Sequence, residues 1–550
     1  MTKDRSTWAG AAVVCLLLAV VHTWPLATAP GMLSRNDNGD TQLNEWILAW
    51  VAHQLPRVPA HLFQANIFYP AHDTLAFSEP LIVPALLGAP LAWLGGSPVL
   101  VFNLMVIAGL ALSALAGYAL LYAWTGDRAA ALVAGSAFAF NTHTLTRIPH
   151  VQGLHLYGLP LALLATDRII TGSGRRQWLW LALWMTVMAY TSGYLIVFGT
   201  LMIAVALVVR VREWAPRLRA TLGAFAAATF CAGLAILPLA IPYQRVAREQ
   251  HMVRPLELVA EYSATPMGYL AASGTLHMAT WSAPLFKDPV DSFFPGIVVI
   301  VLAVVAVAAA ARRRPETPDR PPALMRRRVL MLVGIAAVGF VLSLGTRTPV
   351  YGWLYAVFPP MRGLRAAARF GNLFLLGMAL LAGLGMAGLS GRTAGRRLAA
   401  AGVLALAALV NVEALRAPLA FHPFEGIPRI YKFLAAYEGP VVLAEVPFYP
   451  RQAVFQNGEY VLNSTAHWRP LMNGYSGYTP ESYGRFADTF WYFPEERAIQ
   501  AMRRAGVTHV MVHPRRFGRD ADDVVRQVDA RSEFELIAIG RGGMRLYRLH

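Results

Sequence analysis

Residues 99–124 have the sequence VLVFNLMVIAGLALSALAGYALLYAW, an apolar run without a charged side chain. A helix needs about 20 predominantly apolar residues to cross the hydrocarbon core of a bilayer, and this run exceeds that length. Further apolar runs follow along the 550-residue chain, which is 56% hydrophobic and only 14% charged. The sequence therefore predicts a polytopic α-helical membrane protein.

The apolar runs predict about eleven membrane-spanning helices. Lys3 and Arg5 precede the first run and place the N-terminus in the cytoplasm. That run, 8–29, is interpreted as a retained span, because it is longer than a signal-peptide core and no small-residue cleavage site ends it. The predicted spans are 8–29, 99–124, 129–141, 156–170, 178–190, 194–209, 220–241, 296–311, 329–344, 370–389 and 398–415.

The distribution of arginine supports this topology. The arginine-rich loops, 312–328 above all, then lie in the cytoplasm, and the C-terminus lies outside the cell membrane. The net charge of +17 needs no nucleic-acid partner, and we expect none. Residues 81–95 are apolar but short for a span, and they contain Pro84 and Pro90. We predict a helix in the outer interface there, and whether it crosses the membrane stays open.

The topology predicts two domains, a transmembrane domain of residues 1–417 and a soluble extracytoplasmic domain of residues 418–550. Three long outer loops belong to the first: 30–98, 243–295 and 346–369. The second has turn signals between short apolar segments and is predicted to be an α/β domain. Its predicted strands are 441–446, 507–512, 534–539 and 544–549, and its predicted helices are 427–437, 481–490 and 494–505.

The first outer loop begins with the acidic run Asn36-Asp37-Asn38-Gly39-Asp40. Residues 42–50 follow, with apolar residues at helical spacing and tryptophan at two positions four residues apart. This pattern predicts an amphipathic helix at the level of the lipid headgroups. Acidic side chains placed just outside the first span are candidates for chemistry at the membrane surface.

Three arginines near the end of the third outer loop, Arg362, Arg365 and Arg369, lie on the side of the membrane that the positive-inside rule disfavours. Their spacing would put them on one face of a helix. Positive charge kept at this place indicates an anionic partner, and a lipid phosphate held by guanidinium groups is the natural candidate. The structural alternative is hydrogen bonding to helix carbonyls or to the outer domain.

Several of these stretches are similar to a known family. Gly39-Asp40 directly after the first span, then Phe68-Tyr69-Pro70 and the interfacial helices, resemble the C-type (GT-C) superfamily of integral-membrane glycosyltransferases. Segments 360–370, 462–464 and 473–478 resemble the YfhO-like bacterial membrane proteins. The resemblance implies a GT-C-like fold in the bacterial inner membrane. It also implies transfer of a sugar from a polyprenyl-phosphate-linked donor to a cell-envelope glycan, lipid or protein on the outer face.

The resemblance assigns the catalytic base to an acidic residue of the first outer loop. Asp40 is favoured because it follows the glycine and opens the predicted helix, and Asp37 is a supporting candidate. As alternatives, Asp40 could be the N-cap of that helix and Asp37 an exposed turn residue. The departing lipid phosphate needs positive charge, which the three arginines would supply. Further substrate-binding candidates are His72, Asp73, Glu79, His150, Asn473 and Tyr475.

Some alternatives stay open. His143, His150 and His155 lie near Arg147 on a short outer connection and form either a second substrate wall or interfacial anchors. The sequence indicates no certain cofactor. A divalent metal stays open, although no compact set of ligands is apparent. Two other functions also stay open: a transporter or flippase of lipid-linked saccharides, and a non-catalytic scaffold with the same fold. A transporter would bury charged residues along a path through its spans.

Overall fold

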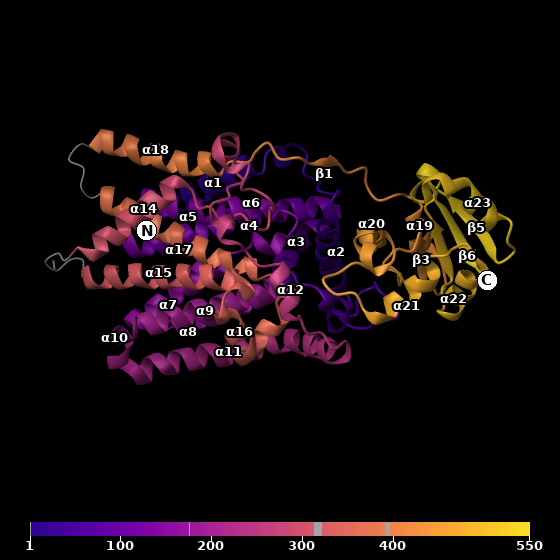
Figure 1. The fold of residues 1–550 in the computed structure, drawn as a ribbon, viewed down its shortest axis with the longest axis horizontal. Coiled ribbons are helices and arrows are strands. Elements are labelled where there is room, and N and C mark those ends of the chain that lie inside the picture. The colour runs from indigo at the N-terminus through magenta and orange to yellow at the C-terminus, as the bar shows by residue number, and fades with distance from the viewer. Residues whose placement is uncertain (1, 175, 313–321, 391–395) are drawn as a thin grey trace. The chain divides into compact units, whose positions relative to one another are not determined.

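The computed structural model describes residues 2–174, 176–312 and 322–550 except 391–395. Its contacts divide the chain into two compact units (Figure 1). Unit 1 comprises Met1–Thr28, Met105–Leu239 and Val253–Leu419. Unit 2 comprises Ala29–Leu104, Ala240–Met252 and Ala420–His550, and so joins the whole of the first outer loop, 30–98, to the C-terminal region. The predicted boundary between residues 417 and 418 separates membrane from outer residues, and it stays a prediction.

A helix coincides with each predicted span. These helices are α1 (Thr2–His22), α4 (Pro98–Thr125), α5 (Arg128–Ala139), α7 (Gly158–Thr171), α8 (Gln177–Thr191), α9 (Gly193–Val209), α11 (Leu218–Glu249), α14 (Ile297–Ala311), α15 (Pro322–Ser343), α17 (Gly371–Ser390) and α18 (Arg396–Ala414). Among the described residues, three stretches are long and apolar enough to cross a bilayer: Pro98–Thr125, Val211–Glu249 and Ala367–Leu389. The chain has the composition of a membrane protein, and the number of crossings stays a prediction.

Helix α17 packs against α5, α14 and α15 within unit 1. Its sequence carries five glycines, which let the helices approach closely. A Cβ atom at Gly385 would collide with the carbonyl oxygen of Leu302 in α14. Lipid tails are as apolar as leucine, so such close packing, rather than exclusion of water, holds membrane helices together.

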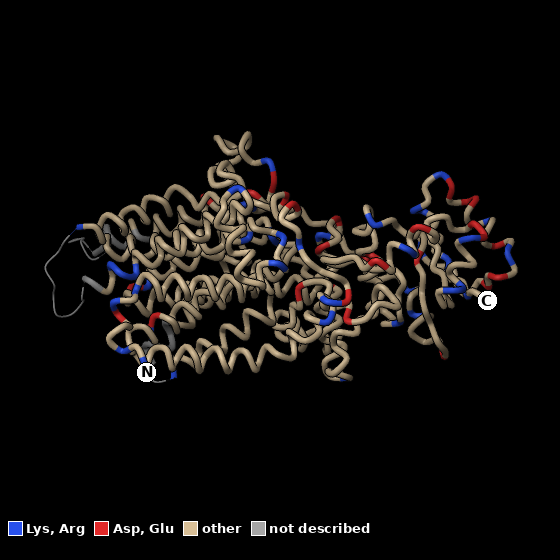
Figure 2. Tube along the Cα trace, turned by 60° about the horizontal axis from the view of Figure 1, so that its bottom comes forward, with Lys and Arg blue, Asp and Glu red and all other residues tan. Residues whose placement is uncertain are grey.

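Charged residues of unit 1 gather toward the ends of its long helices, and the middles of these helices carry few (Figure 2). This distribution is expected for helices that cross a hydrocarbon layer. Parts of the predicted cytoplasmic clusters, including Arg175, Arg313, Arg314 and Arg392, lie outside the described residues.

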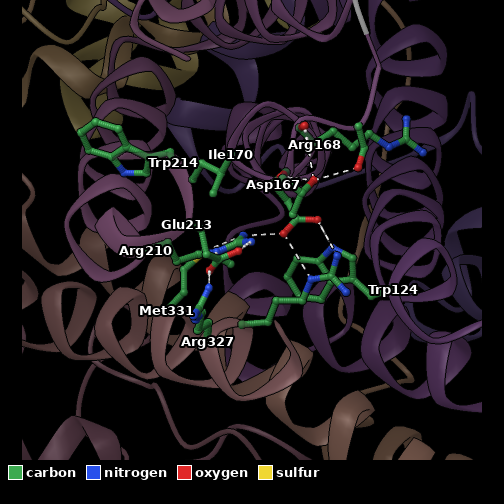
Figure 3. A network of polar contacts seen from close by, with 12 residues as sticks. Trp124, Asp167, Arg168, Ile170, Arg210, Glu213, Trp214, Arg327 and Met331 are labelled. Atoms are coloured by element: carbon green, nitrogen blue, oxygen red, sulfur yellow. Dashed lines mark hydrogen bonds and ion pairs between the residues drawn. The ribbon is translucent and has the colours of Figure 1, made fainter. Parts of the chain in front are cut away.

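A buried network of charged side chains links the ends of several helices of unit 1 (Figure 3). Asp167 in α7 is 2% exposed and accepts hydrogen bonds from Trp124 at 3.0 Å, from Arg328 at 2.8 Å and from Arg210. Arg210, at the end of α9, also donates to both carboxylate oxygens of Glu213 in α10 (Val211–Trp214), at 2.7 and 2.6 Å. These charges neutralise one another at helix ends, unlike charges that follow a transport path.

Unit 2 contains a four-stranded sheet with the order β3-β4-β6-β5. β3 (Leu443–Val446) pairs in parallel with β4 (His509–Val512), so that Leu443 lies opposite His509. β6 (Arg545–Leu549) is antiparallel to β4 and to β5 (Phe534–Ile539). Every residue of β3 and β4 is buried, which is typical of central strands covered on both faces. All four strands lie within the predicted ones.

Short helices accompany this sheet in sequence. α19 (Tyr431–Ala436), α21 (Glu481–Phe490) and α22 (Glu496–Arg504) coincide with predicted helices. α20 (Gly458–Asn463) and α23 (Ala521–Asp529) were not expected from the sequence. A two-stranded ladder joins β1 (Leu33–Ser34) of the first outer loop to β2 (His422–Pro423), so residues nearly 400 positions apart form one unit.

The amphipathic helix predicted over residues 42–50 belongs to α2 (Gly39–Gln54), but it does not lie on a surface. Residues Thr41 to Leu48 are all buried, because α3 (Ile82–Trp93) and α20 pack against α2. The indole of Trp46 donates to Asn66 Oδ1 at 3.3 Å, and that of Trp50 donates to Leu62 O at 2.8 Å. The expectation of a headgroup-level helix is therefore wrong for α2: its tryptophans fill a protein core. α3 occupies the apolar segment 81–95, and its position at the interface stays a prediction.

Candidate functional site

Asp40 lies in the first turn of α2, and its side chain is not the helix cap. The N-cap is Asn38, whose Oδ1 accepts hydrogen bonds from the backbone N–H groups of Asp40 at 2.9 Å and Thr41 at 3.3 Å. Asn38 thus satisfies the donors that would otherwise have recruited an acidic side chain. The carboxylate of Asp40 is directed to another partner.

That partner is Tyr475, whose phenol donates to Asp40 Oδ1 at 2.6 Å. Both side chains are partly buried. Gly39 makes the approach of the C-terminal segment close: a Cβ at this position would lie 2.9 Å from the carbonyl oxygen of Phe455 and 3.2 Å from the Tyr475 ring. Gly39 therefore lets the C-terminal segment approach the backbone closely. The phenol of that segment then holds the Asp40 carboxylate.

Asp37 occupies a different environment. It is exposed and forms an ion pair with Arg35 at 3.1 Å, with His422 Nε2 at 3.8 Å. Exposed pairs of this kind contribute little to stability and leave a carboxylate well hydrated. The structure thus places the two acids of the opening run in unlike surroundings, one exposed in a turn and one held between segments.

Glu45, which the sequence did not single out, lies one turn further along α2. Its carboxyl is fully buried and accepts a hydrogen bond from the Ser34 hydroxyl at 2.9 Å. Burial raises the pKa of Glu45 to about 8, although the bond from Ser34 opposes the shift. One feature of the sequence indicates that Glu45 is unusual: it is an acidic residue inside an otherwise apolar helical stretch. Such a residue is neutral near pH 7 and acts as a hydrogen-bonding group in the core.

The remaining acidic candidates of the first loop do not form a common cluster. Asp73 is buried, bonds to Gln64 through its Oδ1 at 2.6 Å, and pairs with Arg245 at 2.9 Å. His72 is exposed, and Glu79 is partly buried. Among the described residues, no group of three or more His, Cys, Asp or Glu side chains is placed to share a metal ion.

Asn473, a predicted substrate-binding residue, is completely buried. Its amide brackets the backbone of Glu445 in β3: Asn473 Oδ1 accepts from the Glu445 N–H at 2.7 Å, and its Nδ2 donates to the Glu445 carbonyl at 3.0 Å. This pairing anchors the 473–478 turn to the sheet. Asn473 thereby supports the turn that presents Tyr475.

Unit 1 contains a small recess of about 30 Å³, enough for one or two water-sized groups. Two predicted residues, His150 and Arg369, come together there from segments more than 200 residues apart. Its other polar lining residues include His143, Arg147, Tyr194 and Asn372. Two arginines around so small a space create a site suited to the oxygens of an anion.

Tyr194 organises this recess, and the sequence did not indicate it. Its hydroxyl accepts hydrogen bonds from the backbone N–H groups of Arg365 at 3.1 Å and Ala366 at 2.8 Å. The Arg369 guanidinium lies over its ring, 4.5 Å from the ring centroid. Cation–π contact of this kind orients a guanidinium without neutralising its charge. The sequence feature that could have drawn attention to Tyr194 is Ser192-Gly193, the short connection between two predicted spans.

His143 adds a neutral group to the recess. It is buried and stacks on Phe293 with ring centroids 4.3 Å apart. Burial, reinforced by the positive charges of Arg147 and Arg369, holds the pKa of His143 well below its usual value. His143 is therefore an uncharged imidazole at neutral pH, able to donate one hydrogen bond to an anion.

The three candidate arginines do not share a helical face, as the spacing had suggested. The segment forms two separate 3-10 turns, Pro359–Gly363 and Ala367–Phe370, with extended backbone at Leu364 between them. Arg362 is exposed and donates to the carbonyls of Tyr355 and Ala356, at 3.4 and 3.2 Å. Arg365 lies over the Tyr262 ring at 5.3 Å. Of the three, Arg369 lines the recess.

Comparison with known proteins gives a likeness of fold. No family model matches the sequence, and no curated protein sequence matches it. The arabinofuranosyltransferase AftD from Mycobacteria has a similar structure, with a TM-score of 0.59 and 17% identity over 99% of this chain and 40% of AftD. The archaeal oligosaccharyltransferase AglB from Archaeoglobus fulgidus matches with a TM-score of 0.46 and 13% identity, over 100% of this chain and 74% of AglB.

The chain thus spans about two fifths of the length of AftD, and over that length its fold is similar to that of AftD. The predicted fold agrees with this likeness, and membership of the GT-C superfamily stays a prediction. The resemblance to YfhO-like proteins, the site residues and the side of the membrane on which the C-terminal region lies stay predictions.

Proposed function

We propose that the protein is a membrane glycosyltransferase that moves a sugar from a polyprenyl-phosphate-linked donor to a cell-envelope acceptor on the outer face of the membrane. The observation that carries this proposal is the environment of Asp40. Its carboxylate is released from helix capping by Asn38 and is oriented by the Tyr475 phenol at 2.6 Å. A fold like that of AftD supports the reaction class.

In the proposed reaction Asp40 is the general base. It accepts the proton of the acceptor hydroxyl as that oxygen attacks the anomeric carbon, and the bond from the anomeric carbon to the lipid phosphate breaks. Tyr475 donates a hydrogen bond to Asp40 Oδ1 and so holds the carboxylate in one orientation. Holding the base in one orientation lowers the entropic cost of reaching the transition state. Asp37, exposed and paired with Arg35, has at most a supporting role.

The leaving polyprenyl phosphate acquires charge in the transition state and requires positive groups near it. We propose that Arg369 and Arg147 supply them, with His143 and His150 as hydrogen-bond donors. The recess admits only one or two oxygen-sized groups, so it would hold phosphate oxygens while the sugar and the lipid lie outside it. Arg365 and Arg362 are secondary in this scheme. A divalent metal is not required for it.

The test is a transfer assay with the full-length chain in lipid nanodiscs. Because AftD is an arabinofuranosyltransferase, a polyprenyl-phosphate-linked arabinofuranose is the first donor to examine. Asp40→Asn should lower transfer at least about 100-fold, since it removes the base and keeps the shape. Asp37→Asn is the matched control and should retain most of the activity. Full activity of Asp40→Asn would rule out the assignment, and a wild-type chain inert with every polyprenyl-linked donor would instead favour a scaffold.

A further inference from the structure

A second hollow lies in unit 2, at the opposite end of α2 from Asp40. It is a groove of about 720 Å³, within the size range of sites for small organic ligands. His53 and Asp40 are thirteen residues apart on the same helix, which corresponds to roughly 20 Å along its axis. The groove is therefore distinct from the surroundings of Asp40. Side chains that carry its chemistry are His53, Arg57, Trp93, Thr465 and Trp468.

One wall of the groove is an aromatic stack. Trp468 lies on the His53 imidazole with ring centroids 4.2 Å apart, and its ring is 5.8 Å from that of Trp50. The backbone of Trp468 has a φ of 56°, a left-handed conformation that is strained for a bulky residue. Its N–H bonds to Ser464 O at 2.8 Å, which helps to hold this conformation. The fold thus presents this indole at the expense of local strain.

Trp93, at the end of α3, also lines the groove. Its indole N–H donates to the carbonyl of Ala52 at 2.9 Å, so the ring is fixed in orientation. It is nevertheless 58% exposed, and its ring surface remains available. Two indoles from segments far apart in sequence therefore border one hollow, each held by contacts that leave part of its surface uncovered.

Polar groups lie beside these rings. Arg57 donates one N–H to the His53 carbonyl at 2.7 Å and keeps further N–H groups for a ligand. Burial, with a smaller effect of Arg57, lowers the pKa of His53 to about 4, so its imidazole is neutral and offers both a donor and an acceptor. Among the described residues that line the groove, Arg57 alone is charged at neutral pH.

We propose that this groove binds a saccharide. Flat aromatic surfaces match the apolar C–H faces of sugar rings, and neighbouring groups that both donate and accept hydrogen bonds match their hydroxyls. A lipid chain cannot form hydrogen bonds with the imidazole or the guanidinium, whereas the hydroxyls of a sugar can bond to both. The inference rests on the proposed function in one respect only: it identifies the bound saccharide as part of the acceptor, which would then be a glycan long enough to reach from the groove toward Asp40.

The test is binding without turnover. Full-length protein in fluorescent nanodiscs is applied to an array of bacterial envelope glycans, and spots that retain it are quantified. We expect retention on at least one class of glycan, weakened about five- to tenfold by Trp468→Ala and by Trp93→Ala. Trp468→Phe, which keeps an aromatic ring, should restore most of the binding. Trp491→Ala is the matched control, because Trp491 is 50% exposed but does not line the groove.

Thermal unfolding of each variant shows whether it is folded. If Trp468→Ala is unfolded, Trp93→Ala tests the groove independently, because Trp93 belongs to another segment. Absence of retention on every glycan, or retention equal in wild type and both alanine variants, would overturn the proposal. Loss of a co-purifying lipid from Trp468→Ala, with glycan retention unchanged, would assign the groove to lipid and also overturn it. Asp40→Asn should keep wild-type retention, so failure of the proposed reaction and failure of this site are separable.

Discussion

Tyr475 and Asp40 are 435 positions apart in the chain, and the phenol of one donates to the carboxylate of the other at 2.6 Å. The contact joins the 473–478 turn, which Asn473 anchors to the sheet strand β3, to the first turn of α2. The proposed catalytic site therefore includes a residue of the C-terminal region. If Asp40 is the base, then its orientation depends on a residue outside the membrane-spanning part of the sequence.

Replacing Tyr475 by phenylalanine should lower kcat about ten- to hundredfold, because a hydrogen bond to a charged group contributes roughly 1.5–3 kcal/mol. The KM for the lipid-linked donor should stay unchanged, since the phenol holds the base and not the phosphate. Steady-state kinetics of transfer measure both constants. Tyr478→Phe is the control, because its hydroxyl bonds to the carbonyl of Gln250 at 3.2 Å. Equal losses in the two variants would indicate a general effect on the turn.

Arg369→Gln should raise the KM for the donor about tenfold or more, because it removes a charge beside the proposed phosphate position. Arg147→Gln should act in the same direction. Arg362→Gln provides the comparison, since Arg362 is exposed and bonds to backbone carbonyls, and a much smaller change is expected. Donor titrations at fixed acceptor give these values. A larger effect at Arg362 than at Arg369 would contradict the placement of the phosphate.

Glu45 should make stability depend on pH. Its pKa is about 8 in the folded protein against an ordinary value of 4.5, so the folded state binds the proton more tightly. The contribution of protonated Glu45 is full below about pH 4.5 and is lost as the pH rises toward 8, by up to about 1.4 kcal/mol per pH unit. The unfolding temperature should therefore fall between pH 5 and pH 8. In Glu45→Gln this part of the slope should vanish, and an unchanged slope would show that another group is responsible.

Asp167→Asn should destabilise the helical unit by about 3 kcal/mol or more, because it removes the carboxylate that pairs with Arg328 and one of the two that pair with the buried Arg210, the other being that of Glu213 (Figure 3). Thermal or denaturant unfolding in detergent measures the loss. Asp523→Asn is the matched control: Asp523 pairs with Arg526 on an exposed helix, where such a pair contributes under about 0.5 kcal/mol. Similar stabilities of the two variants would mean that the buried network is not a structural requirement.

The positions of the helices and of the sheet strands could be predicted from the sequence. A bilayer requires about 20 apolar residues for each crossing, and that demand is local, so runs such as 99–124 identify helices without knowledge of their neighbours. The strands β3 and β4 followed from short apolar segments bounded by turns. α23 was missed because its apolar residues are few and its exposed face is strongly charged.

The helix α2 shows where local pattern was insufficient. Two tryptophans four residues apart are compatible with a membrane surface or with a protein core, and only the packing of α3 and α20 decided for the core. Likewise the spacing of Arg362, Arg365 and Arg369 suggested one helical face, whereas Pro359 and Pro360 begin a 3-10 turn and the extended Leu364 separates the arginines.

By itself, the sequence determined that this chain is a membrane protein of apolar helices with a C-terminal α/β region, because the hydrophobic demand of each element acts over adjacent residues. It also singled out Asp40 as the favoured base and gave Arg369 as one of three candidate arginines. Only the tertiary structure decided what surrounds them: Tyr475 for the one, Tyr194 and Arg147 for the other, and a tryptophan-lined groove at the far end of α2. Such partners come from segments hundreds of residues apart, and their meeting depends on the packing of the whole chain.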